Sequence, residues 1–127
     1  MTADVRNLLR FAAVLASNAA TASAQVTAVV GRGALNVKNG WRDNARATSG
    51  HHARLYPASI SYDVTAIPGG ARAEIGPDKA APQGPLGNLL EFGSSKNPPH
   101  NDGGRALAAE DAQFTVHMTA IADPLGR

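Results

Sequence analysis

Two runs of alternating apolar and polar residues, joined by a turn, constrain the fold of this chain more than any other feature. Apolar residues occupy every second position of residues 60–66 and again of residues 71–75. A period of two is typical of a strand with one buried face. The Pro-Gly-Gly sequence at 68–70 has the composition of a tight turn. The sequence therefore predicts a β-hairpin over residues 59–76.

The segment before the hairpin has the pattern of one long amphipathic helix. Across residues 5–37, apolar or small residues recur at spacings of three and four, which places them on a single stripe. Gly31 and Gly33 each cost about 1 kcal/mol relative to alanine in a helix interior, so we expect a bend or break near the first of them. Helical character then continues to Ala47, with Trp41 as the anchor of this half against the sheet.

The residues after the hairpin predict a loop, a short apolar element and a second helix. Pro77–Gly87 contains three prolines and two glycines and is expected to be a loop. The apolar residues of 89–92 are expected to supply a third short strand or turn. Arg105–Ile121 again has apolar residues at helical spacing, and Asn101 or Asp102 is its expected capping residue.

A length of 127 residues suits one domain, so we expect a single domain over residues 1–127. Its expected class is α+β: a long N-terminal helix packed on a small antiparallel sheet, made of the β-hairpin plus a short strand, with a C-terminal helix. Apolar residues make up 43% of the chain, but many are alanine, and aromatic residues make up only 5%. Because alanine buries little apolar area, this composition favours a domain that neighbouring subunits stabilise.

The sequence lacks the patterns of several classes of site. It has no cysteine, which excludes disulfides and thiolate metal sites. Two of its histidines, His51 and His52, are adjacent in a loop, where both side chains cannot easily reach one ion. No nucleophile elbow, phosphate-binding glycine loop or His-Glu-x-x-His motif is present. We therefore expect no enzymatic activity, no metal site and no cofactor.

No stretch of the sequence approaches the roughly 20 apolar residues that a membrane-spanning helix needs. The chain is therefore not expected to have a membrane partner.

The stretch Leu89–Leu107 reads LLEFGSSKNPPHNDGGRAL and has the shape of a known family motif. It resembles the second half of the gp-ten-like family of siphophage tail components, also called head–tail joining or tail-completion proteins. A shorter match lies upstream, within residues 47–60, where Ala-Thr-Ser-Gly, a leucine and Ser-Ile follow the family order. The matching residues of the main motif are Glu91, Phe92, Gly93, Ser94, Ser95, Lys96, Pro98, Pro99, Ala106 and Leu107.

This resemblance implies a structural virion protein of a long-tailed bacteriophage. The implied subunit forms a ring, a hexamer, in the head–tail connector (neck) or in the tail-completion or tail-terminator region, where it joins the DNA-filled head to the tail. The implied partners are other copies of the chain and other neck and tail proteins, namely a connector or stopper and the tail tube. The implied location is the virion, after assembly in the host cytoplasm.

The motif residues are candidates for anchoring a loop or contacting a neighbouring subunit. Glu91 is expected to accept hydrogen bonds from backbone amides of the following loop, or to meet an arginine of a neighbour. In this interpretation Phe92 fills a core or subunit pocket, and Gly93 adopts a positive φ. Pro77–Gly87 and Ser94–Gly104 are poor in apolar residues and are expected to become ordered only in the assembly.

Positive charge is concentrated in the first half of the chain. Residues 1–58 contain seven bases and two acids, whereas residues 59–127 contain five bases and eight acids. Three roles stay open: an interface with the acidic half of a neighbouring copy, the lining of a channel for double-stranded DNA contacted through phosphate alone, or a solvated helix face. The same charge supports an alternative function, a small basic non-specific nucleic-acid-binding protein. The candidate basic face consists of Arg32, Lys38, Arg42, Arg46 and Arg54.

Overall fold

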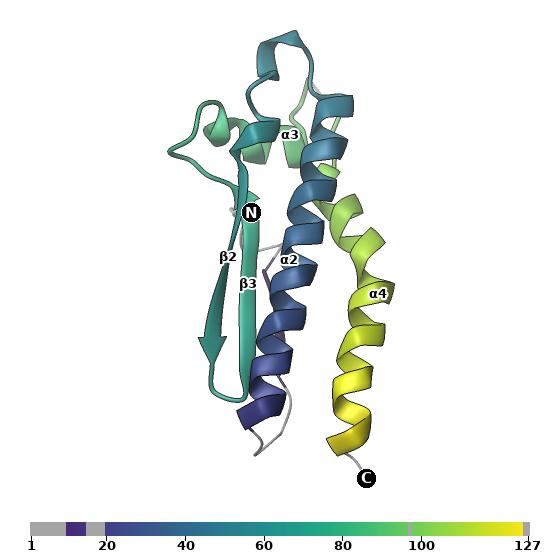
Figure 1. The fold of residues 1–127 in the computed structure, drawn as a ribbon. Coiled ribbons are helices and arrows are strands. Elements are labelled where there is room, and N and C mark those ends of the chain that lie inside the picture. Colours follow the sequence, from purple (N-terminus) through teal and green to yellow (C-terminus); the bar gives the residue numbers. More distant parts are fainter. Residues whose placement is uncertain (1–9, 15–19, 97, 126–127) are drawn as a thin grey trace.

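A long helix lies between a small sheet and a second helix in the computed structural model, which describes residues 10–14, 20–96 and 98–125 (Figure 1). The long helix, α2, spans Ala20–Thr48 and packs on one face of the sheet. The second helix, α4, spans Asp102–Leu125 and runs along the side of α2 that faces away from the strands. The structure is thus α+β, with a long helix on an antiparallel sheet and a C-terminal helix, as the sequence predicted.

The sheet has three antiparallel strands in the order β1-β3-β2. Strands β2 (Ile60–Ile67) and β3 (Gly70–Pro77) form the predicted hairpin. Gly69 in the turn has a φ of 78°, a conformation that glycine adopts without steric cost. Strand β1 (Arg10–Val14) pairs with the opposite edge of β3.

The predicted third strand was wrong, because residues 89–92 are helical. They belong to the short helix α3 (Gly87–Phe92), which ends where Gly93 turns to a φ of 77° and its amide donates to the carbonyl of Leu89. The third strand is β1 instead, which the periodicity had placed inside the long helix. An alanine-rich segment such as Arg10–Val14 suits either structure, and pairing with the open edge of β3 decides between them. The remaining early residues of the predicted helix, 5–9 and 15–19, lie outside the described residues.

A bend or a break was predicted near Gly31, and the break was wrong, since α2 is continuous from Ala20 to Thr48. A methyl group on Gly33 would lie 3.0 Å from Cδ1 of Phe114 in α4, and one on Gly40 would lie 3.3 Å from Cβ of Ala106. These two glycines therefore mark the closest approach of α4 to α2. Gly31 has nothing within 4 Å of such a group, so its role is not one of close packing.

The hydrophobic core lies between α2 and the sheet. The buried stripe of α2 meets the alternate buried residues of β3, and Trp41 is fully buried, as expected for the anchor of this helix. The main core residues are Val26, Val30, Ala34, Val37, Trp41 and Ala45 of α2, Tyr56 and Ile60, and Ala71, Ala73 and Ile75 of β3. None of the helices in the described ranges is both long enough and apolar enough to cross a membrane.

Candidate functional site

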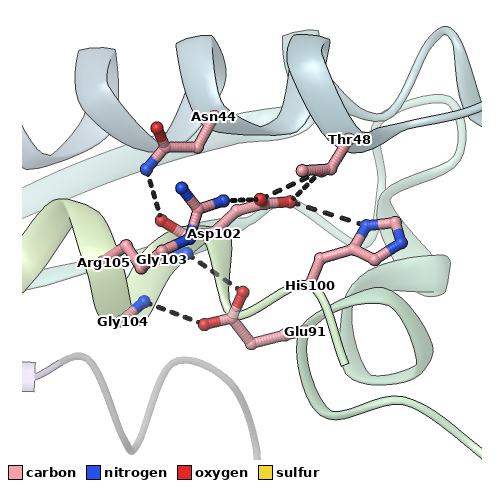
Figure 2. A network of polar contacts seen from close by, with 8 residues as sticks. All are labelled: Asn44, Thr48, Glu91, His100, Asp102, Gly103, Gly104 and Arg105. Carbon is pink, nitrogen blue, oxygen red and sulfur yellow. Dashed lines mark hydrogen bonds and ion pairs between the residues drawn. The ribbon is translucent and has the colours of Figure 1, made fainter. Parts of the chain in front are cut away.

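A cluster of polar side chains lies where the end of α2, the loop after α3 and the start of α4 meet (Figure 2). Figure 2 draws eight residues of it, which we call the polar cluster: Asn44, Thr48, Glu91, His100, Asp102, Gly103, Gly104 and Arg105. Two carboxylates, those of Glu91 and Asp102, are buried at its centre.

Glu91 extends from α3 to the N-terminus of α4. Its Oε1 accepts a hydrogen bond from the backbone nitrogen of Gly103 at 3.0 Å, and its Oε2 accepts one from that of Gly104 at 2.9 Å. The first amides of a helix have no partner within the helix and carry partial positive charge, so a carboxylate is well placed there. The prediction that Glu91 accepts backbone amides is confirmed, although these amides belong to the helix that follows the loop.

Asp102 joins α4 to the end of α2. The hydroxyl of Thr48 donates to its carboxylate, with Oγ1 at 2.9 and 2.8 Å from the two carboxylate oxygens. Nη2 of Arg105 donates to Oδ1 at 2.7 Å, and Nδ1 of His100 lies 3.7 Å from Oδ2. The backbone carbonyl of Asp102 accepts a further hydrogen bond from Nδ2 of Asn44 at 2.9 Å. A buried carboxylate with several donors is held in one position.

The loop between α3 and α4 is anchored at its second end as well. The amide of His100 donates to the carbonyl of Leu90, and that of Asn101 donates to the carbonyl of Glu91. Asn101 has a φ of 52°, which turns the chain into α4. Gly93 has the positive φ that was expected of it. The range Ser94–Gly104 was predicted as one loop, but its last three residues form the first turn of α4.

Most of the other motif residues lie on the surface of this loop or beside it. Phe92 is 41% exposed, so the expectation that it fills a pocket in the core of this chain was wrong, and a pocket in a neighbouring subunit remains a prediction. Two motif residues, Ala106 and Leu107, belong instead to α4, where Ala106 is buried and Leu107 is half-buried. The five motif positions within the loop are all exposed: Ser94, Ser95, Lys96, Pro98 and Pro99. The motif thus has buried residues at both ends, Glu91 and Ala106, and an exposed segment between them.

Tyr56 lies beside the two buried carboxylates and was not singled out by the sequence. Burial raises the pKa of its hydroxyl well above the usual value, and the negative charges of Glu91 and Asp102 raise that pKa further. The Trp41 indole opposes this shift. Its contact with Tyr56 falls short of a well-formed hydrogen bond, since neither Nε1 of Trp41 nor the hydroxyl has a partner of good geometry in the described part of the chain.

The candidate basic face divides between internal and external roles. Arg42 donates from Nε and Nη2 to the carbonyl of Ile60, at 3.0 and 2.7 Å, and from Nη2 to that of Ala58 at 3.3 Å. Arg46 forms an exposed ion pair with Asp43 at 2.8 Å. Because these guanidinium groups have partners within the chain, the arrangement adds no support to a non-specific nucleic-acid-binding function.

The three other basic residues differ in setting. Nζ of Lys38 lies 5.5 Å from the centre of the Tyr62 ring, in cation–π range. Arg32 is exposed on α2, and Arg54 is exposed in the loop that follows the short helix η1 (His51–Ala53). Their predicted role at an interface or channel remains a prediction.

The histidines of the described ranges do not gather with carboxylates into a group of three or more that could hold a metal ion. His51 and His52 contact each other edge to face, with ring centres 5.7 Å apart. His100 lies beside Asp102 in the polar cluster. The carboxylate of Asp102 already accepts hydrogen bonds from Thr48 and Arg105.

The sequence analysis missed the two partners of Asp102 that α2 supplies. Asn44 and Thr48 are four residues apart, so the sequence alone indicates that they share one face of the helix. Nothing local shows that this face meets a residue more than fifty positions later in the chain.

No known protein family, curated protein or solved structure matches this chain.

Proposed function

We propose that this chain is a structural virion protein of a long-tailed bacteriophage. It forms a ring, with six copies as the expected number, in the head–tail connector or in the tail-completion or tail-terminator region. The observation that carries the proposal is that the Glu-Phe-Gly-Ser-Ser-Lys motif and its two prolines divide into a buried and an exposed part. Glu91 is buried and holds the start of α4, whereas the residues that follow it form an exposed loop.

This division suits a subunit that acts through its shape. A structural protein needs a loop that neighbours can contact and a fixed geometry at the base of that loop. The amides of Gly103 and Gly104 hold the base on one side, and the bond from His100 to Leu90 holds it on the other. The exposed residues 94–96, 98 and 99 then extend from a fixed base, which lowers the entropy lost on assembly.

Apolar surface supports an interface at the same end of the molecule. Figure 1 shows that α3 and the loops on either side of it gather at the end where α2 finishes. Leu89 and Phe92 of α3 are 44% and 41% exposed. Exposed large apolar residues beside a polar loop are typical of the contact surface of an oligomer. The surface formed by Leu89, Phe92 and residues 94–96, 98 and 99 is therefore our proposed subunit interface.

Oligomeric state tests the proposal. Sedimentation velocity across a concentration series, together with negative-stain electron microscopy, should show ring-shaped particles of about six copies. The double substitution Leu89→Ser and Phe92→Ser should reduce ring formation without unfolding the subunit, because both side chains are already exposed. Val116→Ser is the matched control, since Val116 is 65% exposed on α4, away from this surface.

A wild-type chain that remains monomeric at every concentration would contradict a self-assembling ring. Rings that survive the double substitution unchanged would leave ring formation intact but remove the proposed interface.

A further inference from the structure

The strand β2 has an open edge. It is the outermost strand in the order β1-β3-β2, so the described part of the chain has no strand on its other side. The amide of Asp78 donates to the carbonyl of Ser59 at 2.8 Å, which makes these two a hydrogen-bonded pair at the start of the ladder. Because such pairs alternate along an antiparallel ladder, the backbone groups of Tyr62, Val64 and Ala66 point away from β3.

The contact of Arg42 supports this assignment and limits the open edge. Ile60 belongs to the same outward-pointing set, and its carbonyl accepts the two short hydrogen bonds from Arg42. The first outward carbonyl of β2 is therefore already paired. The edge that remains open runs from Tyr62 to Ala66 and ends before Pro68, which cannot donate a ladder hydrogen bond.

A shallow, open groove of about 640 Å³ runs beside this edge, between β2 and α2. Its floor combines the half-buried Tyr62 and Val64 with Leu35, which is 37% exposed. Gly31 adds depth, since nothing lies within 4 Å of the position of its missing side chain. The full set of lining residues is Thr27, Ala28, Gly31, Arg32, Leu35, Tyr62, Asp63 and Val64.

The helix side of the groove is positively charged. Arg32 is exposed on α2 and lines the groove, and Lys38 lies over the Tyr62 ring two turns of helix further on. Asp63 is the one acidic lining residue, but side chains alternate along a strand, so it projects from the opposite face of β2 to Tyr62 and Val64. The groove thus combines an apolar floor with a cationic rim.

We propose that the open edge of β2 and this groove bind an extended segment of another polypeptide, which adds to the sheet as an antiparallel fourth strand. The segment forms hydrogen bonds with the outward backbone groups of Tyr62, Val64 and Ala66. Every second side chain of the segment faces α2: an aliphatic one enters the groove and a carboxylate reaches Arg32. Backbone pairing of this kind supplies affinity, and the groove supplies selectivity. The inference does not rest on the proposed function.

A second copy of β2 is a poorer occupant than a foreign segment. The groove-side residues of β2 are Tyr62, Val64 and Ala66, and none of them carries a carboxylate for Arg32. Two paired copies would also bring their two cationic rims onto the same face of one sheet. A segment that alternates aliphatic and acidic residues on one face can pack on the apolar floor of the groove and pair with its cationic rim.

The test uses the full chain and a synthetic peptide, Thr-Val-Thr-Glu-Thr-Val-Thr, blocked at both ends. Titration followed by amide NMR should move the signals of Tyr62, Val64, Ala66 and Arg32. A peptide with lysine in place of glutamate should bind about tenfold more weakly, because it meets the cationic rim with a like charge. Arg32→Glu should weaken binding of the glutamate peptide by a similar factor, whereas the matched control Arg54→Glu should not.

N-methylated peptides test strand addition itself. In the antiparallel arrangement, the amides of the groove-facing valines and glutamate point at β2, so methylation there should abolish binding. Methylation of the threonine amides should leave binding unchanged. The proposal is overturned if the peptide moves no β2 signals, if both methylated sets bind equally, or if Arg32→Glu has no effect. It is also overturned if the β2 signals move with protein concentration alone, since a second copy would then occupy the edge.

Discussion

Glu91 and Gly103 are twelve residues apart, and the carboxylate of the first accepts a hydrogen bond from the backbone amide of the second at 3.0 Å. One short helix thereby caps the N-terminus of another. Most helix caps come from the residue just before the first turn. Here the cap comes from the far side of the loop, so the closure of the loop and the start of α4 depend on the same side chain.

Removing this cap should destabilise the fold. Glu91→Ala leaves the amides of Gly103 and Gly104 without their acceptor and should lower the free energy of unfolding by about 2 kcal/mol. Glu91→Gln keeps one acceptor oxygen and should cost less than the alanine substitution. Denaturant unfolding followed by the fluorescence of Trp41, the single tryptophan of the chain, measures both. Equal stability of all three proteins would show that water replaces the carboxylate without loss.

Stability should fall at alkaline pH because of Tyr56. Burial raises the pKa of its hydroxyl in the folded state, so the folded protein keeps the proton after the unfolded chain has lost it. The contribution of the protonated Tyr56 to stability is complete below the pKa of about 10 that tyrosine has in an unfolded chain. This contribution is lost as the pH rises above that value. Tyr56→Phe should remove this part of the decline, and Tyr62→Phe is the control. Unfolding curves between pH 8 and pH 11 test the difference; identical pH dependence in wild type and Tyr56→Phe would contradict it.

Two glycines of α2 should respond in opposite ways to the same substitution. Gly31→Ala places a methyl group in open space and should stabilise the protein by up to about 1 kcal/mol through helix propensity. Gly33→Ala places the methyl group 3.0 Å from the ring of Phe114, so the same gain should be cancelled or reversed. Thermal unfolding of both variants measures the difference. A matching gain in both would mean that α4 moves away from α2 at little cost.

Arg42 and Arg46 should also differ, although both belong to the candidate basic face. Arg42→Ala leaves the carbonyl of Ile60 without two charged donors and should cost about 1–2 kcal/mol of stability. Arg46→Ala removes one exposed ion pair and should cost less than about 0.5 kcal/mol. Chemical denaturation of the two variants provides the comparison. Arg42 is therefore unsuited to a test of surface charge, and Arg32 or Arg54 should be used for that purpose.

Local patterns were the part of the fold that could be predicted. The hairpin was predicted because alternation and a Pro-Gly-Gly turn lie within one short stretch, and α4 was predicted from its apolar spacing. Strand β1 could not be predicted in the same way. Its pairing partner, β3, lies some sixty residues away, and an alanine-rich pentapeptide has no period that separates strand from helix.

The candidate site was predictable to a similar extent. Glu91 was predicted as an acceptor of backbone amides because it stands between apolar residues before a polar loop. The helix start was expected three residues too late, at Arg105, so the amides of Gly103 and Gly104 were assigned to the loop. The role of Asp102 was predicted only as a possible cap. Its bonds to Thr48 depend on the close approach of α4 to α2, which Gly33 and Gly40 permit. Gly33 had been interpreted, with Gly31, as the cause of a bend or break, so the close approach was missed.

The anchored loop between α3 and α4 has a practical consequence for engineering. Its anchors lie at Glu91, His100 and the first turn of α4, and none of them belongs to the exposed residues 94–96. Lengthening a loop between fixed ends costs only about 0.6 kcal/mol for each doubling of its length. A peptide tag inserted between Ser95 and Lys96 should therefore leave the subunit folded while altering the surface that neighbours meet. Such an insertion allows folding and assembly to be measured separately, although most substitutions change both properties together.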